Sequence, residues 1–115
     1  MGAEAAGALI IASDQFYFGR MREIAMLAGR QGIAAIGPIR EFAVEGGLMS
    51  YGTNIGETNR QAGVYVGRIL KGERPADLPV LRPTKFDLVL NLKAAKALAI
   101  EISPKLLALA DEVIE

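Results

Sequence analysis

The chain has 115 residues, the length of one ordinary domain or of part of a larger one. Hydrophobic residues make up 51% and charged residues 23%, so we expect a packed core rather than disorder. Lys and Arg together number 13, as do Asp and Glu, and this formal net charge of zero provides no basic surface for nucleic acid. No His or Cys occurs, which excludes Ser-His and Cys-His catalytic pairs, disulfides and the usual zinc sites.

The first half of the chain alternates short apolar runs with helical patterns. The run Gly7–Ser13 favours a strand buried on both faces. Residues 18–31 then place apolar side chains at the spacing of a helix face, and Gly32 is a typical helix end. The elements expected next are a strand over residues 33–37, a helical turn over 40–44 and a strand over 48–51.

The second half opens with a longer helix over residues 55–70. Asn54 suits its N-cap, and Glu57 follows at the spacing of a capping box. Gly63 and Gly67 each cost this helix about 1 kcal/mol, which a close packing contact could offset. The three prolines between Pro75 and Pro83 indicate an extended connector. The last expected elements are a strand over residues 86–91, a helix over 92–99 and a helix from Pro104 to about Ala110.

This order of elements predicts an α/β fold, with a mostly parallel sheet flanked by helices on both faces. Ligands of such sheets bind outside the carboxyl ends of the strands. The polar side chains expected there are Ser13, Asp14, Arg40, Tyr51 and Asn54. As a set they suit a small polar solute. Each also has a structural interpretation, with Asp14 and Asn54 as helix caps and Tyr51 in the core.

Motifs for phosphate chemistry are missing from the sequence. Neither a P-loop nor a G-x-G-x-x-G fingerprint occurs, and the loosely glycine-rich segment 52–56 indicates a strand-to-helix turn. The spacing of Asp14, Glu41 and Glu45 defines no acid–base pair. We therefore expect no cofactor, no metal and no catalytic residue, and an enzyme on a flavodoxin-like sheet is the least favoured class.

Several segments together carry a family resemblance. They are GGLMSYG at residues 46–52, RQAG at 60–63, GRILKGERPADLPV at 67–80, PTKFDLVLNLKAAKAL at 83–98 and the tail at 104–114. With these segments the chain resembles the ABC-transporter substrate-binding proteins of the type I periplasmic-binding fold, from Gly7 onward. The most similar subgroup is the uncharacterised or tryptophan/tyrosine-type amino-acid binders. Members are much longer and have two lobes, and only their C-terminal part is matched.

The resemblance implies a single α/β lobe over residues 1–115, the flavodoxin-like half of such a protein. It implies the solute-binding component of an ABC-type importer, which takes up a small polar solute such as an amino acid without catalysis. The partners implied are that solute and an ABC permease, with no nucleic acid. The implied location is the periplasm or cell envelope, although Met1–Glu4 does not begin a secretory signal. The alternative is the effector-binding half of a transcription regulator with the same fold.

The resemblance also implies roles for particular segments. Ser13 and Asp14 would face the cleft, and Tyr51–Asn54 would lie where the chain crosses between lobes. Gly37 departs from the family, which often has an aromatic residue there. The helix over residues 55–71 would pack on a missing lobe or on a partner chain through Ala62, Val66, Ile69 and Leu70. We therefore expect a homodimer, which could exchange this helix about a hinge at Gly52–Asn54 or at the proline connector.

Overall fold

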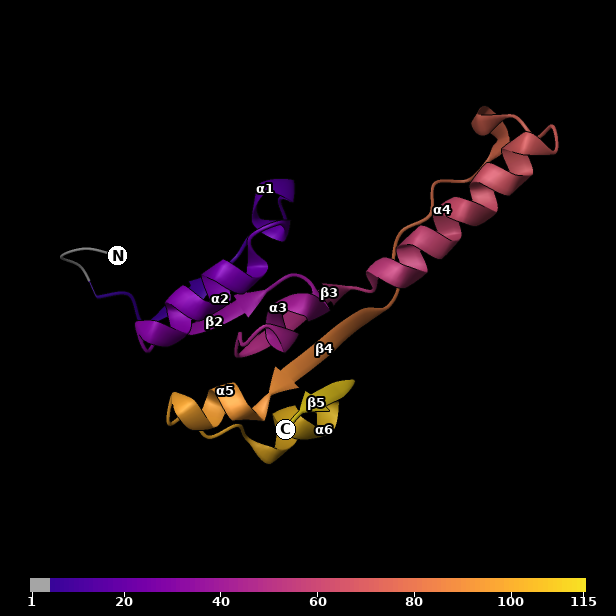
Figure 1. Cartoon of the computed structure of the whole chain (residues 1–115). Coiled ribbons are helices and arrows are strands. Elements are labelled where there is room, and N and C mark those ends of the chain that lie inside the picture. Colours follow the sequence, from indigo (N-terminus) through magenta and orange to yellow (C-terminus); the bar gives the residue numbers. More distant parts are fainter. Residues whose placement is uncertain (1–4) are drawn as a thin grey trace.

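A computed structural model describes residues 5–115, so Met1–Glu4, which the signal-peptide expectation concerned, lie outside the described residues. One sheet carries five strands in chain order: β1 (Ala8–Ile10), β2 (Ala34–Gly37), β3 (Met49–Thr53), β4 (Phe86–Asn91) and β5 (Glu112–Ile114). β1 pairs with β2, β2 with β3 and β4 with β5 in parallel, whereas β3 and β4 are antiparallel (Figure 1). The predicted mostly parallel α/β sheet is confirmed.

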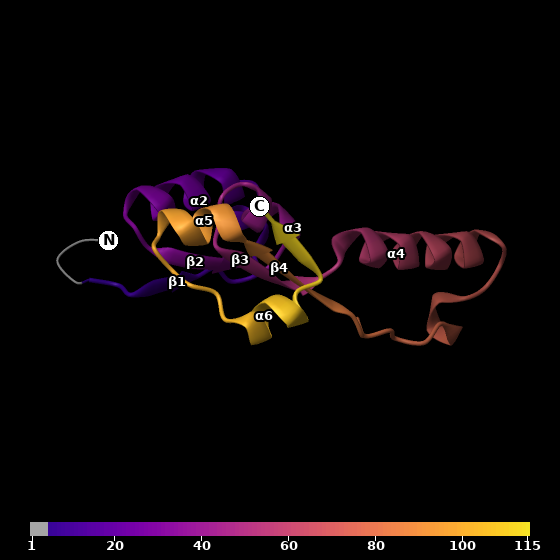
Figure 2. The same cartoon turned by 90° about the horizontal axis from the view of Figure 1, so that it is seen from below.

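The five helices that the sequence predicted are present, with two short additions, α1 and η1, and the helix predicted to begin at Phe18 begins at Met21. They are α1 (Gln15–Phe18), α2 (Met21–Arg30), α3 (Arg40–Val44), α4 (Ile55–Leu70), α5 (Leu92–Ala97) and α6 (Pro104–Leu109), with a 3₁₀ turn, η1 (Pro75–Asp77), in the connector. Figure 2 shows α2, α3 and α5 on one side of the sheet and α6 on the other. Among residues 5–115, no helix has the length and apolar character needed to span a bilayer.

The core lies between the sheet and α2. Met21, Ala25 and Ala28 of α2 pack with Ile11, Ala35 and Phe42, and the Phe42 side chain is completely buried. A Cβ at Gly37 would stand 2.5 Å from the Phe42 ring, and one at Gly47 would stand 2.1 Å from it. The Phe42 ring thus occupies the space that a side chain at position 37 would need. The glycine at position 37 is therefore a packing requirement of the core.

The opposite face of the sheet is covered unevenly. The strand register places Ile10, Ile36, Met49 and Leu90 in one row across four strands. Ile10, on the edge strand, is 80% exposed, whereas Leu90 is fully buried. The prediction that the first strand is buried on both faces is therefore wrong. That apolar run is an edge strand, and only its inner face is covered.

β5 was not predicted, because three residues give too short a pattern to read. Asp111 fixes the start of this strand against β4 by two hydrogen bonds with Leu88. Its N–H donates to the Leu88 carbonyl at 2.9 Å, and its carboxylate accepts from the Leu88 N–H at 2.8 Å. The strand is also tied to α3. Arg40 donates two hydrogen bonds to the Glu112 carboxylate, at 2.6 and 2.7 Å. The hydrogen bond from Arg40 is the main cause that lowers the pKa of Glu112.

The chain is elongated because one segment projects from the sheet. Its radius of gyration is 17.5 Å, against roughly 13 Å for a compact domain of about 100 residues. We call α4 together with residues 71–85 the arm. It leaves the sheet after β3 and returns into β4, as Figure 1 shows. None of the 16 residues of α4 is buried. A hydrogen bond joins α4 to the returning connector within the arm, because the Tyr65 hydroxyl donates to the Pro79 carbonyl.

The start of α4 confirms half of the predicted capping box. The Asn54 side chain accepts from the Glu57 N–H at 2.9 Å. The Glu57 carboxylate pairs with Arg60 at 2.6 Å instead of reaching back to the Asn54 N–H. The predicted extended connector is confirmed for most of its length, and η1 interrupts it with Pro75 in the first turn.

The space around two glycines predicts opposite effects on stability when each is replaced by alanine. Gly47→Ala should lower the free energy of unfolding by roughly 1–3 kcal/mol, because the new methyl group overlaps the Phe42 ring. Gly29→Ala is the matched control, because nothing lies within 4 Å of its Cβ position in α2. It should raise stability by up to about 1 kcal/mol. Urea denaturation of both variants measures this, and a Gly47→Ala variant as stable as wild type would contradict the packing account.

The tie between Arg40 and Glu112 predicts a pH-dependent stability. The folded pKa of Glu112 is lowered, so its contribution is complete above the ordinary carboxyl pKa and is lost as the pH falls through the lowered value. Glu112→Gln should cost at most about 1 kcal/mol at pH 7, because both side chains are partly exposed. The difference from wild type should shrink as the pH falls below the ordinary carboxyl pKa and through the lowered value. Thermal melts from pH 7 to pH 2 test this, with Glu101→Gln as a control expected to show no loss.

Candidate functional site

Four of the predicted site residues, Ser13, Asp14, Arg40 and Asn54, follow strand ends at one edge of the sheet, and Tyr51 lies within β3. The carboxyl ends of β1, β2 and β3 meet there with the amino ends of β4 and β5, because β4 runs antiparallel to β3 and β5 follows β4 in parallel. The arm leaves and rejoins the sheet at the same edge (Figure 1). The edge therefore combines polar strand ends with the root of a projecting segment.

Ser13 and Asp14 follow β1, and both are exposed. Asp14 is the N-cap of α1, and its carboxylate accepts from the Phe16 N–H at 2.8 Å. The capping interpretation of Asp14 is therefore confirmed. The cap uses one carboxylate oxygen, and the second oxygen can accept from another donor. Phe16 and Tyr17 pack edge to face with ring centroids 5.6 Å apart, and both are exposed. Sequence reasoning did not select these two aromatic rings.

Arg40 and Tyr51 are both engaged with neighbours. The Arg40 guanidinium is bound by Glu112, whose hydrogen bond is the main cause that raises the pKa of Arg40. Tyr51 is 55% exposed, so its alternative placement in the core is wrong. Its ring stacks on Phe86 with centroids 5.8 Å apart, because Tyr51 and Phe86 project from the same face of neighbouring strands.

Asn54 lies where β3 ends and α4 begins, and both ends of its amide are used. The oxygen caps α4, and the nitrogen donates to one oxygen of Asp87 at 2.8 Å. The other oxygen of Asp87 is buried and accepts no hydrogen bond from residues 5–115. The Lys85 ammonium lies 3.6 Å from it. Asn54 therefore joins the two strands at the root of the arm.

A small pocket of about 80 Å³, which we call the edge pocket, opens between these strand ends. Its floor includes Ser50, which is buried, and its walls include Arg40, Asn54 and Asp87. Gly52 also lines it, and a Cβ there would stand 1.9 Å from the Pro38 carbonyl oxygen. Position 52 therefore requires glycine, since the ends of β2 and β3 approach too closely for a side chain.

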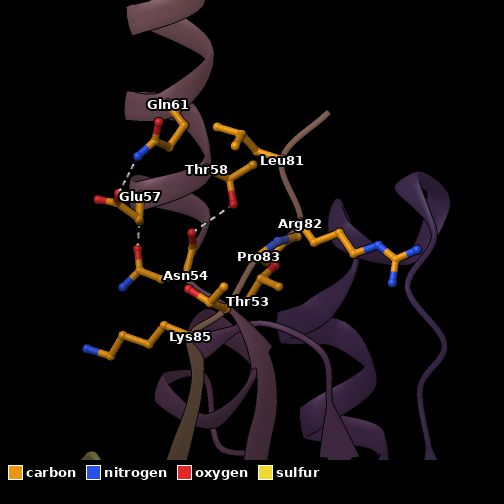
Figure 3. Close-up of a pocket in the computed structure, with 10 residues that line it drawn as sticks. Thr53, Asn54, Glu57, Thr58, Gln61, Leu81, Arg82, Pro83 and Lys85 are labelled. Atoms are coloured by element: carbon orange, nitrogen blue, oxygen red, sulfur yellow. Dashed lines mark hydrogen bonds between the residues drawn. The ribbon is translucent and has the colours of Figure 1, made fainter. Parts of the chain in front are cut away.

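A larger hollow of about 320 Å³, the arm groove, lies between α4 and the returning connector. Figure 3 shows its lining residues: Thr53, Asn54, Glu57, Thr58, Gln61, Leu81, Arg82, Pro83, Thr84 and Lys85. The side chains of Arg82 and Lys85 point away from the groove in that view. The hydrogen bond from Arg60 lowers the pKa of Glu57 to about 2, so this wall carries a carboxylate at neutral pH. Asn54 lines both hollows.

The structure brings only part of the predicted set together. Arg40 and Asn54 share the edge pocket, whereas Ser13, Asp14 and Tyr51 line neither hollow. Sequence reasoning missed Ser50 and Asp87. Asp87 was detectable as the one charged residue in the apolar run of β4. The edge supplies hydrogen-bond donors, acceptors and both signs of charge. Among residues 5–115, no group of three or more potential acidic, His or Cys ligands could hold a metal ion.

Solved structures similar to this chain share its fold. A conserved domain protein from Vibrio cholerae is 25% identical with a TM-score of 0.88, and the match covers 94% of this chain and 36% of that one. A Streptococcus pneumonia protein, solved as an ABC domain in complex with L-Trp, is 24% identical with a TM-score of 0.87, over 94% and 37%. A ligand-free, open substrate-binding protein with adhesive properties from Clostridium difficile is 23% identical with a TM-score of 0.61, over 93% and 36%.

The chain thus spans just over a third of the length of these structures. No curated protein matches it at a significant level. The family model described as ABC transporter substrate binding protein matches residues 2–114, nearly the whole chain. The sheet of five strands and the placement of the helices agree with structures of this fold. The chain therefore belongs to the ABC transporter substrate-binding protein family, and its fold is that of a periplasmic-binding protein.

Proposed function

We propose that this edge of the sheet forms one wall of the binding site for a small, amino-acid-like solute. The protein would act as the solute-binding component of an ABC importer and catalyse no reaction. The observation that carries the proposal is the position of Asn54, which lines both the edge pocket and the arm groove. Membership of the substrate-binding family supports it, as does the L-Trp complex of the similar Streptococcus pneumonia protein.

The chemistry of the edge suits a zwitterionic solute. The Arg40 guanidinium offers donors to a carboxylate, in competition with Glu112. The carboxylates of Asp14 and Asp87 offer acceptors to an ammonium group. The exposed rings of Phe16 and Tyr17 provide apolar surface for an aromatic side chain. Ser13, which follows β1, and Tyr51, within β3, carry further hydroxyl groups.

The wall is open, because the arm groove lies between α4 and the returning connector with no further element over it among residues 5–115. A ligand pocket normally buries most of its ligand's surface, so high affinity needs a second wall. We infer that residues 1–115 form one lobe and that, in proteins of the length of the similar structures, a second lobe closes over the solute. The permease partner and a periplasmic or cell-envelope location follow from the same family role and belong to this proposal.

The open wall predicts weak binding that maps to this edge. With L-Trp at millimolar concentration, backbone amide signals of residues 50–57 and of Asp87 should shift in nitrogen–proton NMR spectra. Signals of residues 95–102, beyond the opposite end of β4, should not shift. The dissociation constant should be about 1 mM or weaker. Shifts confined to residues 95–102, or submicromolar binding by the monomeric chain, would show that the site is misplaced.

Two substitutions separate solute binding from helix capping. Asp14→Ser and Asn54→Ser keep an oxygen that can cap the following helix, but they remove the carboxylate and the amide. Each should weaken L-Trp binding several-fold while the melting temperature changes by no more than a few degrees. Glu45→Ala is the control and should leave binding unchanged, because Glu45 ends α3 on the side of the amino end of β3, away from the candidate edge. NMR titration of the three variants measures this, and equal effects at all positions would leave Asp14 and Asn54 as caps only.

A further inference from the structure

The cation of the edge pocket is already bound by the chain itself. Arg40 is the one cationic residue among the described residues that line this pocket. Its Nε and Nη2 groups donate to the two carboxylate oxygens of Glu112, at 2.6 and 2.7 Å, in the bidentate geometry of strong ion pairs. The guanidinium has further donors, but a solute carboxylate that reached them would lie near the Glu112 carboxylate. A carboxylate therefore has to displace Glu112 or bind against its charge.

Negative charge predominates around the edge pocket. Glu41 and Asp87 line it as well, and the charge of Glu41 also stabilises the guanidinium of Arg40. Lys85 adds one further cation, 3.6 Å from the Asp87 carboxylate. With Glu112 included, two cations face three carboxylates, so the charge around the pocket is net negative. Such a pocket attracts a cation and repels an anion.

The amino end of α4 also borders the edge pocket, through Ile55 and Gly56. A helix amino end by itself favours a negative charge. Two carboxylates of the chain already meet this demand. Glu57 lies in the first turn of α4, and Asp87 accepts a hydrogen bond from the cap residue Asn54 at 2.8 Å. The field of the helix end is therefore balanced by charges within the chain and does not call for an anionic solute.

The pocket also offers acceptors for a donor group. One oxygen of Asp87 is buried and accepts no hydrogen bond from residues 5–115, and the Lys85 ammonium at 3.6 Å is beyond hydrogen-bonding distance. Ser50 adds a hydroxyl at the floor. A buried carboxylate oxygen without a donor is unfavourable, so a donor is expected there. The volume of about 80 Å³ exceeds the roughly 10–15 Å³ that a water-sized group needs, so an ammonium group fits.

We propose that Glu112 is a specificity-determining residue: by occupying Arg40, it reserves the edge pocket for the ammonium group of the solute and disfavours a carboxylate there. This inference rests on the proposed function and names the end of the solute that enters the pocket. Asp87 and Ser50 accept from the ammonium group, and Glu112 itself need not touch the solute. The solute class is therefore a primary ammonium compound, for which the carboxylate of an amino acid contributes little to binding at this wall.

Three indole compounds that differ in their charged groups test this selectivity. L-Trp carries an ammonium group and a carboxylate, tryptamine carries only the ammonium group, and indole-3-propionate carries only the carboxylate. In nitrogen–proton NMR titrations of the wild-type chain at neutral pH, tryptamine should shift the signals of residues 50–57 and of Asp87 with about the same affinity as L-Trp. Indole-3-propionate should bind there about tenfold more weakly, because it meets like charge.

Two substitutions separate the roles of the carboxylates. Glu112→Gln releases Arg40 and should tighten the binding of indole-3-propionate several-fold, while tryptamine binding changes much less. Asp87→Asn should weaken tryptamine binding several-fold and leave indole-3-propionate nearly unchanged. Glu101→Gln is the matched control, because it removes a carboxylate beyond the opposite end of β4, and it should leave both dissociation constants unchanged. A purely structural role of Glu112 would affect both compounds alike, so the ratio of the two dissociation constants is the measured quantity.

The outcomes distinguish this inference from the proposed function. If indole-3-propionate binds at this edge as tightly as tryptamine, or if Glu112→Gln leaves the ratio unchanged, the proposal is overturned while the binding site stands. If none of the three compounds shifts the signals of this edge, the proposed function fails as well. The comparison of the three compounds on the wild-type chain uses no variant, so it decides the matter even if Glu112→Gln does not fold.

Discussion

Five residue pairs, from Met49 with Leu90 to Thr53 with Phe86, join β3 and β4 in antiparallel register, and much of the molecule follows from them. Parallel strands require a crossover that packs on the sheet, whereas an antiparallel pair can be joined by a segment that leaves and returns at one edge. The segment here is the arm, which explains why α4 buries none of its residues. The same register brings Asp87 beside Asn54 and so builds the root of the arm from two strands.

This root is also where the candidate site lies. The chain must pass from β3 into α4 with an N-cap, and it must return into β4 within hydrogen-bonding distance of that cap. Asn54 serves both demands, because its oxygen caps the helix and its nitrogen binds Asp87. The close approach of Gly52 to Pro38 holds the second strand end against the third. The residues that hold the arm on the sheet are thus the ones that line the edge pocket, and a change in the arm's angle would change the pocket's shape.

The molecule divides into a well-packed part and an exposed part. Around Phe42 the packing leaves no room for a methyl group at Gly37 or Gly47. On the arm, by contrast, glycines and apolar side chains face open space. The core is therefore closely packed, whereas the side chains of α4 are largely exposed among residues 5–115.

The sequence by itself determined the type of the longer elements and placed most of their bounds within about three residues, as at α2, which begins at Met21 instead of Phe18. Periodicity, caps and glycine stops are signals between near neighbours, so α4 was predicted to within one residue and its Asn54 cap was recognised. The sequence also located the edge that carries Ser13, Asp14, Arg40, Tyr51 and Asn54. Only the tertiary structure decided which of these residues meet. β5 is too short to carry a pattern of its own, and the bidentate pair of Arg40 with Glu112 joins residues 72 positions apart. The exposure of Ile10 likewise depends on its strand lying at the edge of the sheet. Contacts between residues distant in sequence leave no local trace, because their geometry is set by strand order and packing.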